Sequence, residues 1–486
     1  MKNALYALLA IILVGSVAGC DAFQTLDNSP ENSVPADGAL TDEQGAQSTL
    51  LGLYDETQGF MDDYTIFAAL ASDQASHTGS FPSWSAIDNY TMAAGSPEAE
   101  GQWNGIYDAI NVANLLIAQA QASELDNLDE SEAAAIRAQA RAIRAFCYHG
   151  LVRWFGGQGA LSDAGVPLVL EPTENIDEVT FPSRSTVGEV YGQILADLNQ
   201  AESLMEGNAN EPTDAGFVDN VVIDGLQARA YLYQASIKRR ATGSAQGDYQ
   251  AARDNAQEVL AVNDGLSRLN GIYSSLNSAE SIWELQYNST DGNAMSFFAR
   301  PNGEGGREEY NLDANRSDQF KADSLDNRLS VNIKEAGGTE FIGKYFRLDG
   351  SDHHFILRVS EVKLILAEAL TFLDLSSNQS TIAKQVNDIR RRSYNEINDG
   401  DPDVFDFEEA GAEVNPDSLT SQSEALSVIL EERRDELAFE GHRWHDLNRL
   451  GLAEEVLSLP ASTDRRWPIP QEELDVNENL SQNPGY

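Results

Sequence analysis

The chain carries at positions 138–156 the stretch Ala138-Gln-Ala-Arg-Ala-Ile-Arg-Ala-Phe-Cys-Tyr-His-Gly-Leu-Val-Arg-Trp-Phe-Gly156. Alanine is the strongest helix former, and its small side chain lets neighbouring helices approach closely. We predict one helix from about Ser131 to Phe155, because glycine commonly follows the last helical turn. This stretch therefore predicts a protein built from closely packed helices.

Helix signals recur along the chain in pairs. Thr41 with Gln44 and Thr186 with Glu189 have the spacing of capping boxes, and Pro97 suits a first helical turn. Alanines recur where paired helices must approach, which is typical of degenerate tetratricopeptide units; generic helix packing is the alternative. We expect a mainly α fold, a superhelix of tetratricopeptide-like helical pairs. The pairs are predicted at about residues 41–60, 97–156, 186–262, 357–393 and 423–450.

Two long segments, residues 71–96 and 264–356, have a different composition. They are rich in Gly, Asn, Asp and Ser and contain only short apolar runs, such as 282–287 and 341–346. We predict long loops with a few short strands. Because long loops within a domain usually serve a function, we expect these two segments to form a binding face.

Aromatic residues stand among the polar residues of both segments. Sugar rings have apolar faces and hydroxyl rims, so a site for them needs flat rings edged by amide or charged groups. The alternative is that these rings only pin the loops to the helices. The candidate ligand-binding residues are Phe81, Trp84, Asn89, Tyr90, Phe297, Phe298 and Arg300.

The charge balance excludes some partners. Among 486 residues, 78 are acidic and 32 are Lys or Arg, which gives a formal net charge of -46. Such a surface repels phosphate backbones and anionic lipid headgroups, so we expect no nucleic-acid partner. The hydrophobic content of 42 % is ordinary for a globular protein and permits a sizeable core.

The first residues have the pattern of a signal peptide. Lys2 precedes an apolar run that is too short to span a membrane, and Val17-Ala-Gly-Cys20 resembles a bacterial lipobox. We predict a signal peptide over residues 1–19, lipid attachment at Cys20 and a tether over 20–40. An ordinary cleavage site with a chance cysteine is the alternative. Cleavage leaves Cys147 as the one other thiol, so no intramolecular disulfide is expected.

The segment around residue 440 invites a metal-site interpretation that we reject. His442 and His445 are three positions apart, but no third ligand has a helical spacing and Gly441 should break the helix. We predict instead that Trp444 and Leu447 are core residues beside a network of ion pairs. The predicted pairs are Glu431 with Arg434, Glu440 with Arg443, and Asp446 with Arg449.

We find no catalytic constellation in the sequence. Asp399, Asp401 and Asp403 begin like a calcium loop, but the glycine and the bidentate glutamate that such a loop needs are missing. Cys147 and His149 face apart on a helix, so they are predicted to be packing residues. We therefore expect no enzyme, no cofactor and no metal.

Four segments, in this order, resemble the SusD/RagB family of outer-membrane nutrient-binding lipoproteins. The resemblance covers nearly the whole mature chain. An acidic insert over about 397–421 and the pair His353-His354 depart from the family pattern without putting the assignment in doubt. The segments are residues 138–156 followed by Val166-Pro-Leu-Val169, Leu357-Arg-Val-Ser-Glu-Val-Lys-Leu-Ile-Leu-Ala-Glu-Ala369, Glu431-Glu-Arg-Arg-Asp-Glu-Leu-Ala-Phe-Glu-Gly-His-Arg-Trp-His-Asp-Leu-Asn-Arg449, and Trp467-Pro-Ile-Pro-Gln471 to Asn483-Pro-Gly-Tyr486.

The resemblance implies a function. It implies one domain over residues 41–486 and a lipoprotein on the outer membrane, facing the cell exterior, that captures an oligosaccharide. It further implies delivery of that ligand to a SusC-type TonB-dependent transporter. A binder of peptides or other organic nutrients on the same scaffold is the first alternative. A helical-array glycosidase is the second, because chance carboxylate pairs are unavoidable among 78 acids.

Overall fold

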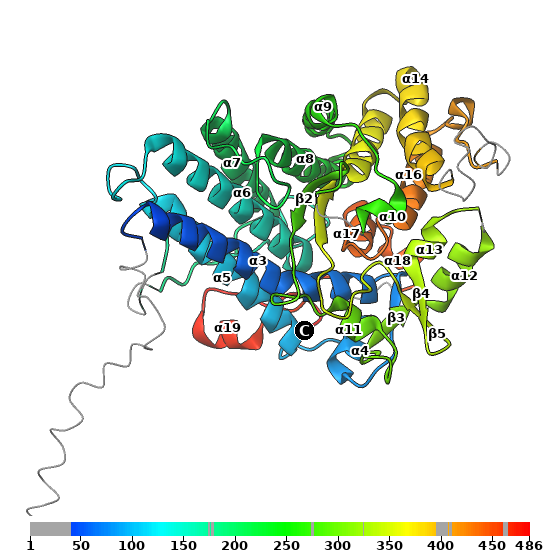
Figure 1. The fold of residues 1–486 in the computed structure, drawn as a ribbon, viewed down its shortest axis with the longest axis horizontal. Helices are drawn as coiled ribbons and strands as arrows, with labels where there is room; N and C mark the ends of the chain where they lie inside the picture. Colours follow the sequence, from blue (N-terminus) through cyan, green and yellow to red (C-terminus); the bar gives the residue numbers. More distant parts are fainter. Residues whose placement is uncertain are drawn as a thin grey trace, which may run out of the picture.

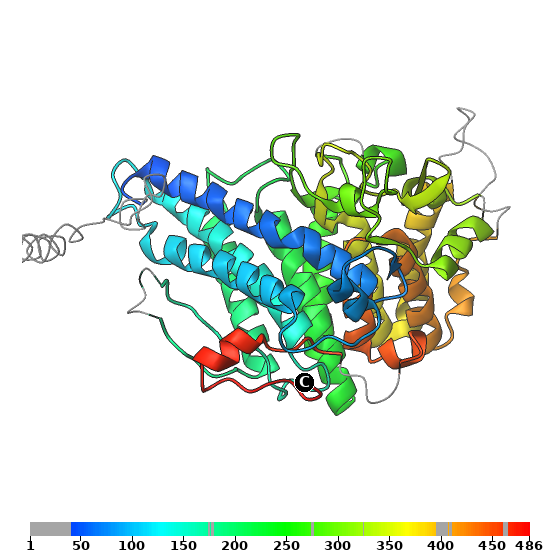
Figure 2. The same ribbon diagram turned by 90° about the horizontal axis from the view of Figure 1, so that it is seen from below.

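Stacked helices make up most of the protein, and shorter elements and loops gather at one end of the stack (Figures 1 and 2). This computed structural model describes residues 40–173, 175, 179–273, 277–323, 325–394, 407, 411–459 and 465–486. The predicted signal peptide, Cys20 and most of the tether lie outside these residues, as do Asp399, Asp401 and Asp403.

The helices follow one another through the stack, each against its neighbour in sequence. The mainly α, tetratricopeptide-like fold is therefore confirmed. The first helix extends ten residues beyond its predicted end near residue 60. The long helices are α3 (Glu43–Leu70), α5 (Pro97–Gln119), α6 (Glu130–Phe155), α7 (Val187–Met205), α8 (Asn220–Thr242), α9 (Gln246–Val262), α14 (Val359–Tyr394), which has two arms across a kink at Asp374, and α16 (Gln422–Glu436), followed by the shorter α17 (Arg443–Leu450).

Caps and small residues explain why these helices form and pack. The Thr186–Glu189 capping box is confirmed at the start of α7, with both reciprocal hydrogen bonds present. Asp129 and Asp219 cap α6 and α8 by accepting from backbone N–H groups. All but one of the alanines of α6 are buried in this helix, which packs against α5 and α7, and Cys147 and His149 are buried among them as predicted.

The described strands form three two-stranded antiparallel sheets. The pair β1 (Ala75–His77) and β3 (Tyr310–Leu312) joins the two segments predicted to form a binding face. The pair β2 (Ser281–Leu285) and β6 (His354–Arg358) lies against α8. The strands β4 (Ile333–Ala336) and β5 (Thr339–Ile342) form a hairpin through two glycines.

The predicted loops contain more helix than we expected. Proline at the first helical position starts α4 (Pro82–Asp88) within the first loop. Four short helices lie within the second loop, where the many polar residues hide the hydrophobic periodicity of such short helices. They are α10 (Leu269–Ile272), α11 (Met295–Ala299), α12 (Ala314–Ala322) and α13 (Arg328–Asn332).

The chain turns sharply at Gly441, and this turn decides which ion pairs form. Its φ of +81° places it in the left-handed region, and α17 starts two residues later. The predicted Glu440–Arg443 pair is therefore wrong. Glu440 instead accepts from Arg358 at 2.9 Å and from Lys344 at 2.6 Å, while Arg443 reaches Asp73 of the α3–β1 connection at 2.8 Å.

The other two ion pairs and the two core residues predicted for this segment are confirmed. Arg434 lies 3.9 Å from Glu431 and Arg449 lies 2.9 Å from Asp446, and Trp444 and Leu447 are buried. His445 Nε2 is 2.8 Å from the hydroxyl of Tyr64. Burial lowers the pKa of His442 to about 4, so this imidazole is neutral at pH 7. Within the described part of the chain, no group of three or more His, Cys, Asp or Glu side chains has metal-binding geometry.

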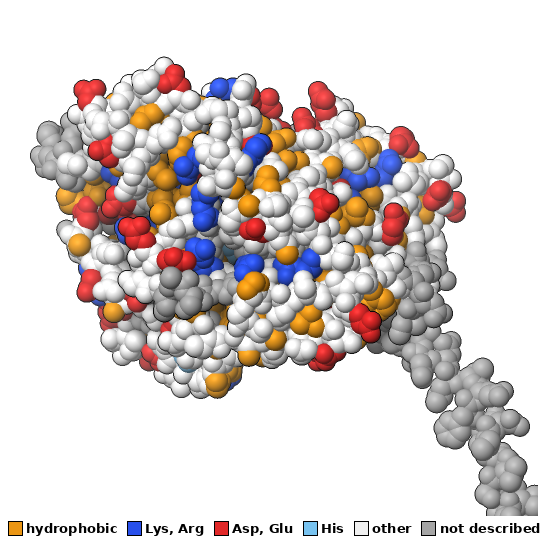
Figure 3. All heavy atoms as spheres, turned by 180° about the vertical axis from the view of Figure 1, so that it is seen from behind, with side chains coloured by type: hydrophobic (Ala, Val, Ile, Leu, Met, Phe, Trp, Pro, Cys, Tyr) orange, Lys and Arg blue, Asp and Glu red, His pale blue; other side chains and the backbone are white. Residues whose placement is uncertain are grey.

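Charges are unevenly spread over the outer surface. Figure 3 shows acidic side chains scattered over the rear face, while Lys and Arg side chains gather near its middle. The excess of acid in the sequence is therefore an average that does not hold at every place on the surface.

The close approach of α8 to β6 can be tested at Gly225. A Cβ atom there would lie 2.2 Å from Leu357 Cδ2, whereas a Cβ at Gly192 in α7 would meet nothing within 4 Å. Alanine favours both helices by about 0.5–1 kcal/mol. We expect Gly192→Ala to stabilise the protein by that amount and Gly225→Ala to destabilise it by about 1–3 kcal/mol through overpacking. Urea unfolding measures both, and equal stabilisation would contradict the proposed tight contact.

Candidate functional site

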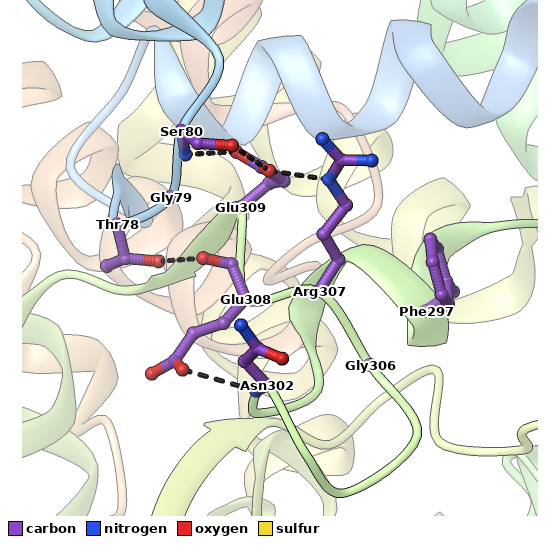
Figure 4. Close-up of a pocket in the computed structure, with 9 residues that line it drawn as sticks. All are labelled: Thr78, Gly79, Ser80, Phe297, Asn302, Gly306, Arg307, Glu308 and Glu309. Carbon is purple, nitrogen blue, oxygen red and sulfur yellow. Dashed lines mark hydrogen bonds and ion pairs between the residues drawn. The ribbon is translucent and has the colours of Figure 1, made fainter.

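A cleft lies where the two predicted binding segments meet at the end of the helical stack (Figure 4). Its volume is about 590 Å³. The first segment contributes the residues after β1, and the second contributes α11 and the turn before β3. The lining residues are Thr78, Gly79, Ser80, Phe297, Asn302, Gly306, Arg307, Glu308 and Glu309.

The carboxylate of Glu309 ties the two walls together. It accepts from Ser80 N at 2.6 Å, from Phe81 N at 3.0 Å, from Ser80 Oγ at 2.9 Å and from Arg307 Nε at 2.7 Å. Burial opposes ionisation, but the hydrogen bonds from Arg307, Phe81 and Ser80 outweigh it and lower the pKa of Glu309. Glu309 is therefore a charged group that holds the cleft walls in place, and its carboxylate oxygens already accept hydrogen bonds from the protein.

Arg307 is the cation of the cleft. Its guanidinium carbon lies 4.2 Å from the ring centroid of Phe81, and its side chain is 45 % exposed. In Figure 4 its terminal nitrogens point away from Glu309, and no acceptor binds them among the described residues. The ring of Phe297, 46 % exposed, also lines the cleft, and Figure 4 shows it on the side of Arg307 that faces away from Glu309. The cleft thus offers free donors beside an apolar ring.

The opposite rim supplies further polar groups. Thr78 Oγ1 donates to the carbonyl of Glu308 at 2.9 Å, and Asn302 N donates to the Glu308 carboxylate at 3.3 Å. The turn between them is tight, because a Cβ at Gly306 would lie 2.1 Å from the carbonyl oxygen of Arg300. This geometry requires glycine there and leaves hydroxyl, amide and carboxylate groups at the edge of the cleft.

Trp84 lies below the cleft and not in it. Its ring is 5 % exposed and contacts Phe67, Phe81, Phe298 and Tyr310 at centroid distances of 5.0–6.2 Å. Both faces of the indole are therefore occupied by protein. In this structure Trp84 pins the two loops to α3, the alternative that the sequence left open.

The remaining candidates divide between the cleft and the scaffold. Phe297 lines the cleft, Phe81 supports Arg307, and Phe298 packs on Trp84. Tyr90 donates to the carbonyl of Ala71 and stacks on Trp444, while exposed Asn89 donates back to Ser85.

Arg300 is directed away from the cleft. Its Nη2 donates to the carbonyl of Phe346 at 2.6 Å, and its guanidinium lies over Phe341. Its polar contacts thus serve the second loop itself.

Sequence reasoning missed most residues of the cleft. Arg307, Glu308 and Glu309 follow a glycine-rich run, and Gly303, Gly305 and Glu308 all have positive φ. The signal that could have found them is this run of charges after clustered glycines inside a long loop. Aromatic residues alone did not reveal these cleft residues, because an aromatic ring can serve either to anchor a loop or to bind a ligand.

Asp62 fastens the second loop to the scaffold. From α3 its Oδ2 accepts from Ala294 N at 2.7 Å, just before α11, and its Oδ1 lies 3.7 Å from His354 Nδ1. Burial raises the pKa of Asp62 to about 7. The position of Phe297 is therefore linked directly to the longest straight helix of the stack.

Stacked tetratricopeptide-like helical pairs are the fold that this chain shares with solved structures of the SusD superfamily. A family profile described as "Starch-binding associating with outer membrane" matches residues 24–216, and one described as "SusD family" matches residues 342–463. The chain belongs to the SusD/RagB family.

Individual relatives agree with this assignment. SusD-like protein P2 of Formosa agariphila is 26 % identical over 544 residues, covering 99 % of each chain. A SusD superfamily structure from Bacteroides thetaiotaomicron has a TM-score of 0.73 at 23 % identity, covering 91 % of this chain and 100 % of that one. A structure described as a laminarin-binding SusD-like protein has a TM-score of 0.72 at 22 % identity, covering 92 % and 100 %.

None of the helices in the described part of the chain is both long enough and apolar enough to cross a membrane.

The role of Glu309 predicts a stability difference between neighbouring residues. Glu309→Gln keeps the shape but sets an amide against several donors, and we expect it to destabilise the protein by about 2–3 kcal/mol. Glu308→Gln, at the partly exposed rim, should change stability by less than about 0.5 kcal/mol. Chemical denaturation of both variants is the measurement. Equal effects would show that Glu309 does not tie the cleft walls together.

Proposed function

We propose that this protein binds a glycan in the cleft between its two loops and releases it unchanged. The observation that carries the proposal is the exposed ring of Phe297 on the same side as the free guanidinium nitrogens of Arg307. Family membership supports it, since one matching profile is described as starch-binding and one structure with this fold as laminarin-binding. The cleft volume also falls within the usual range for small-ligand sites.

Each group in the cleft has a role in this proposal. Phe297 stacks on the apolar face of a sugar ring. Arg307 donates to hydroxyl oxygens, and Glu308 and Asn302 complete the rim with acceptors and donors. Phe81, Trp84 and Phe298 support this surface from below, and Asn89, Tyr90 and Arg300 hold the loops that surround it.

We further propose that the protein is a lipoprotein of the outer membrane that faces the cell exterior and delivers its ligand to a SusC-type TonB-dependent transporter. The lipid is attached at Cys20, ahead of the start of α3. With 28 residues, α3 is about 42 Å long. The strand β1, which leads into the cleft, contacts α3 after the helix ends at Leu70, so the cleft lies toward the carboxyl-terminal end of this helix.

Glycan binding can be tested with two matched phenylalanines. Phe297 is 46 % exposed in the cleft, and Phe181 is 47 % exposed but does not line it. In calorimetry with laminarin oligosaccharides and a panel of other glycans, Phe297→Ala should weaken binding by about 1–3 kcal/mol through lost stacking. Phe181→Ala should bind as the parent does, and both should keep its melting temperature.

The same experiment can disprove the proposal. Unchanged affinity in Phe297→Ala would remove the cleft from the binding site. Peptides that bind where no glycan does would favour a peptide-binding function. Shortened glycan after incubation with repurified protein would indicate hydrolysis.

Lipid attachment is tested separately in cells that receive labelled palmitate. The parent should carry the label in the membrane fraction, because several acyl chains anchor a protein stably. Cys20→Ser should lose both the label and the membrane association. A label that persists in this variant would overturn acylation at Cys20.

A further inference from the structure

A second pocket lies between the segment after α9 and the two arms of α14. Figure 1 shows α9 and α14 on the opposite side of the helical stack from α3. The volume of this pocket is about 330 Å³. None of the residues that line the glycan cleft contributes to it. Its lining residues are Asp264, Leu266, Lys363, Asp388, Arg391 and Arg392.

Lys363 is a buried ammonium with too few acceptors. The residue is 3 % exposed, and its Nζ contacts Asp388 Oδ2 at 3.3 Å. No other acceptor binds it within the described ranges of the chain. An ammonium group has three donors, so two donors of Lys363 stay unused beside an open pocket. Burial of an incompletely paired charge is costly, so binding of a further acceptor at this position is favourable.

The neighbouring carboxylate does not balance the local charge. Besides Lys363, Asp388 Oδ2 accepts from Lys384 at 2.6 Å, and Asp388 Oδ1 lies 3.8 Å from Arg391 Nη1. One carboxylate thus serves three cations. Asp264 adds a single exposed acid at the rim. A positive excess remains, in a chain whose formal net charge is -46.

Arg392 also lines the pocket, but acidic side chains already pair with it. Its guanidinium is paired with Glu280 and Glu436 on the buried side, where Arg358 also binds both acids. Its Nε is buried without a partner among the described residues. Arg392 therefore forms a wall whose charge is already paired, and Leu266 forms an apolar wall.

We propose that this pocket binds an oxyanion, a carboxylate, sulfate or phosphate group, either as a small free anion or as the acidic group of a sugar. The anion's oxygens accept from the two unused donors of Lys363 at the floor and from the guanidinium of Arg391 at the mouth. Charge-assisted bonds of this kind are the strong ones, and a guanidinium fork fits an oxyanion. The volume accommodates a group as large as one acidic sugar.

The chain provides a matched pair of variants for the test. Arg391 and Lys384 both lie beside Asp388 and are 50 % and 62 % exposed, but Arg391 lines the pocket and Lys384 does not. Arg391→Gln and Lys384→Gln therefore remove the same charge with little risk to folding. Lys363→Met removes the buried ammonium at similar volume, and Arg391→Gln carries the test if that variant does not fold.

The measurement is calorimetric titration of the full chain with sodium sulfate, sodium phosphate and sodium glucuronate, each against sodium chloride at equal ionic strength. The chloride arm corrects for general screening of an acidic protein. We expect saturable binding of at least one oxyanion, weakened about tenfold or more by Lys363→Met and by Arg391→Gln. Lys384→Gln should stay within about threefold of the parent.

The arms also separate the two sources of the ligand. Tighter binding of glucuronate than of sulfate and phosphate would assign the pocket to an acidic sugar, and the reverse order would assign it to a free inorganic anion. No binding beyond the chloride arm would overturn the proposal. Binding that Arg391→Gln and Lys384→Gln weaken equally would also overturn it, because it would reflect overall charge and not this pocket.

Discussion

The packing of the carboxyl-terminal half depends on buried guanidinium and carboxylate groups around Arg358. From β6 this side chain donates to Glu280 at 2.7 Å, to Glu436 at 2.6 Å and to Glu440 at 2.9 Å. Arg358, Glu280 and Glu436 are nearly fully buried, and Glu440 is 6 % exposed. Burial opposes ionisation of Glu440, but Arg358 and Lys344 lower its pKa to about 2. Breaking one buried pair costs about 3–5 kcal/mol, so β2, β6 and α16 hold one another in a single arrangement.

Internal pairing of this kind explains how so acidic a chain forms a core. Arg229 with Glu361, Arg449 with Glu368, and Arg433 with Asp446 are further buried pairs. Many of the 32 basic residues thus have internal partners, and much of the acid excess is left at the surface, where water and salt screen it. The loops are held differently, by the rings around Trp84 and by single carboxylates such as Glu309. Scaffold and cleft therefore depend on different interactions, and loop residues can vary without disturbing the helical stack.

Local signals predicted the helices and not their partners. The capping box at Thr186 and the turn at Gly441 were both predicted, because caps and left-handed glycines depend on a few neighbouring residues. The Glu440–Arg443 pair failed for a related reason. Helical spacing favoured it, but the turn at Gly441 removed that spacing and brought Glu440 to Arg358 from a distant strand. Helix starts within the long loops were missed where the helices are too short to show a period.

The sequence by itself determined the helical class, the family resemblance and the two segments that meet at the cleft, because periodicity, composition and motif order are properties of the chain. Only the tertiary structure decided which side chains face the cleft. Trp84 looked like a platform, but Phe298 and Tyr310, from a segment far along the chain, cover its ring. Phe297, beside Phe298, stays exposed. Whether a ring anchors a loop or meets a ligand depends on what packs against it, and pairing of β1 with β3 sets that contact.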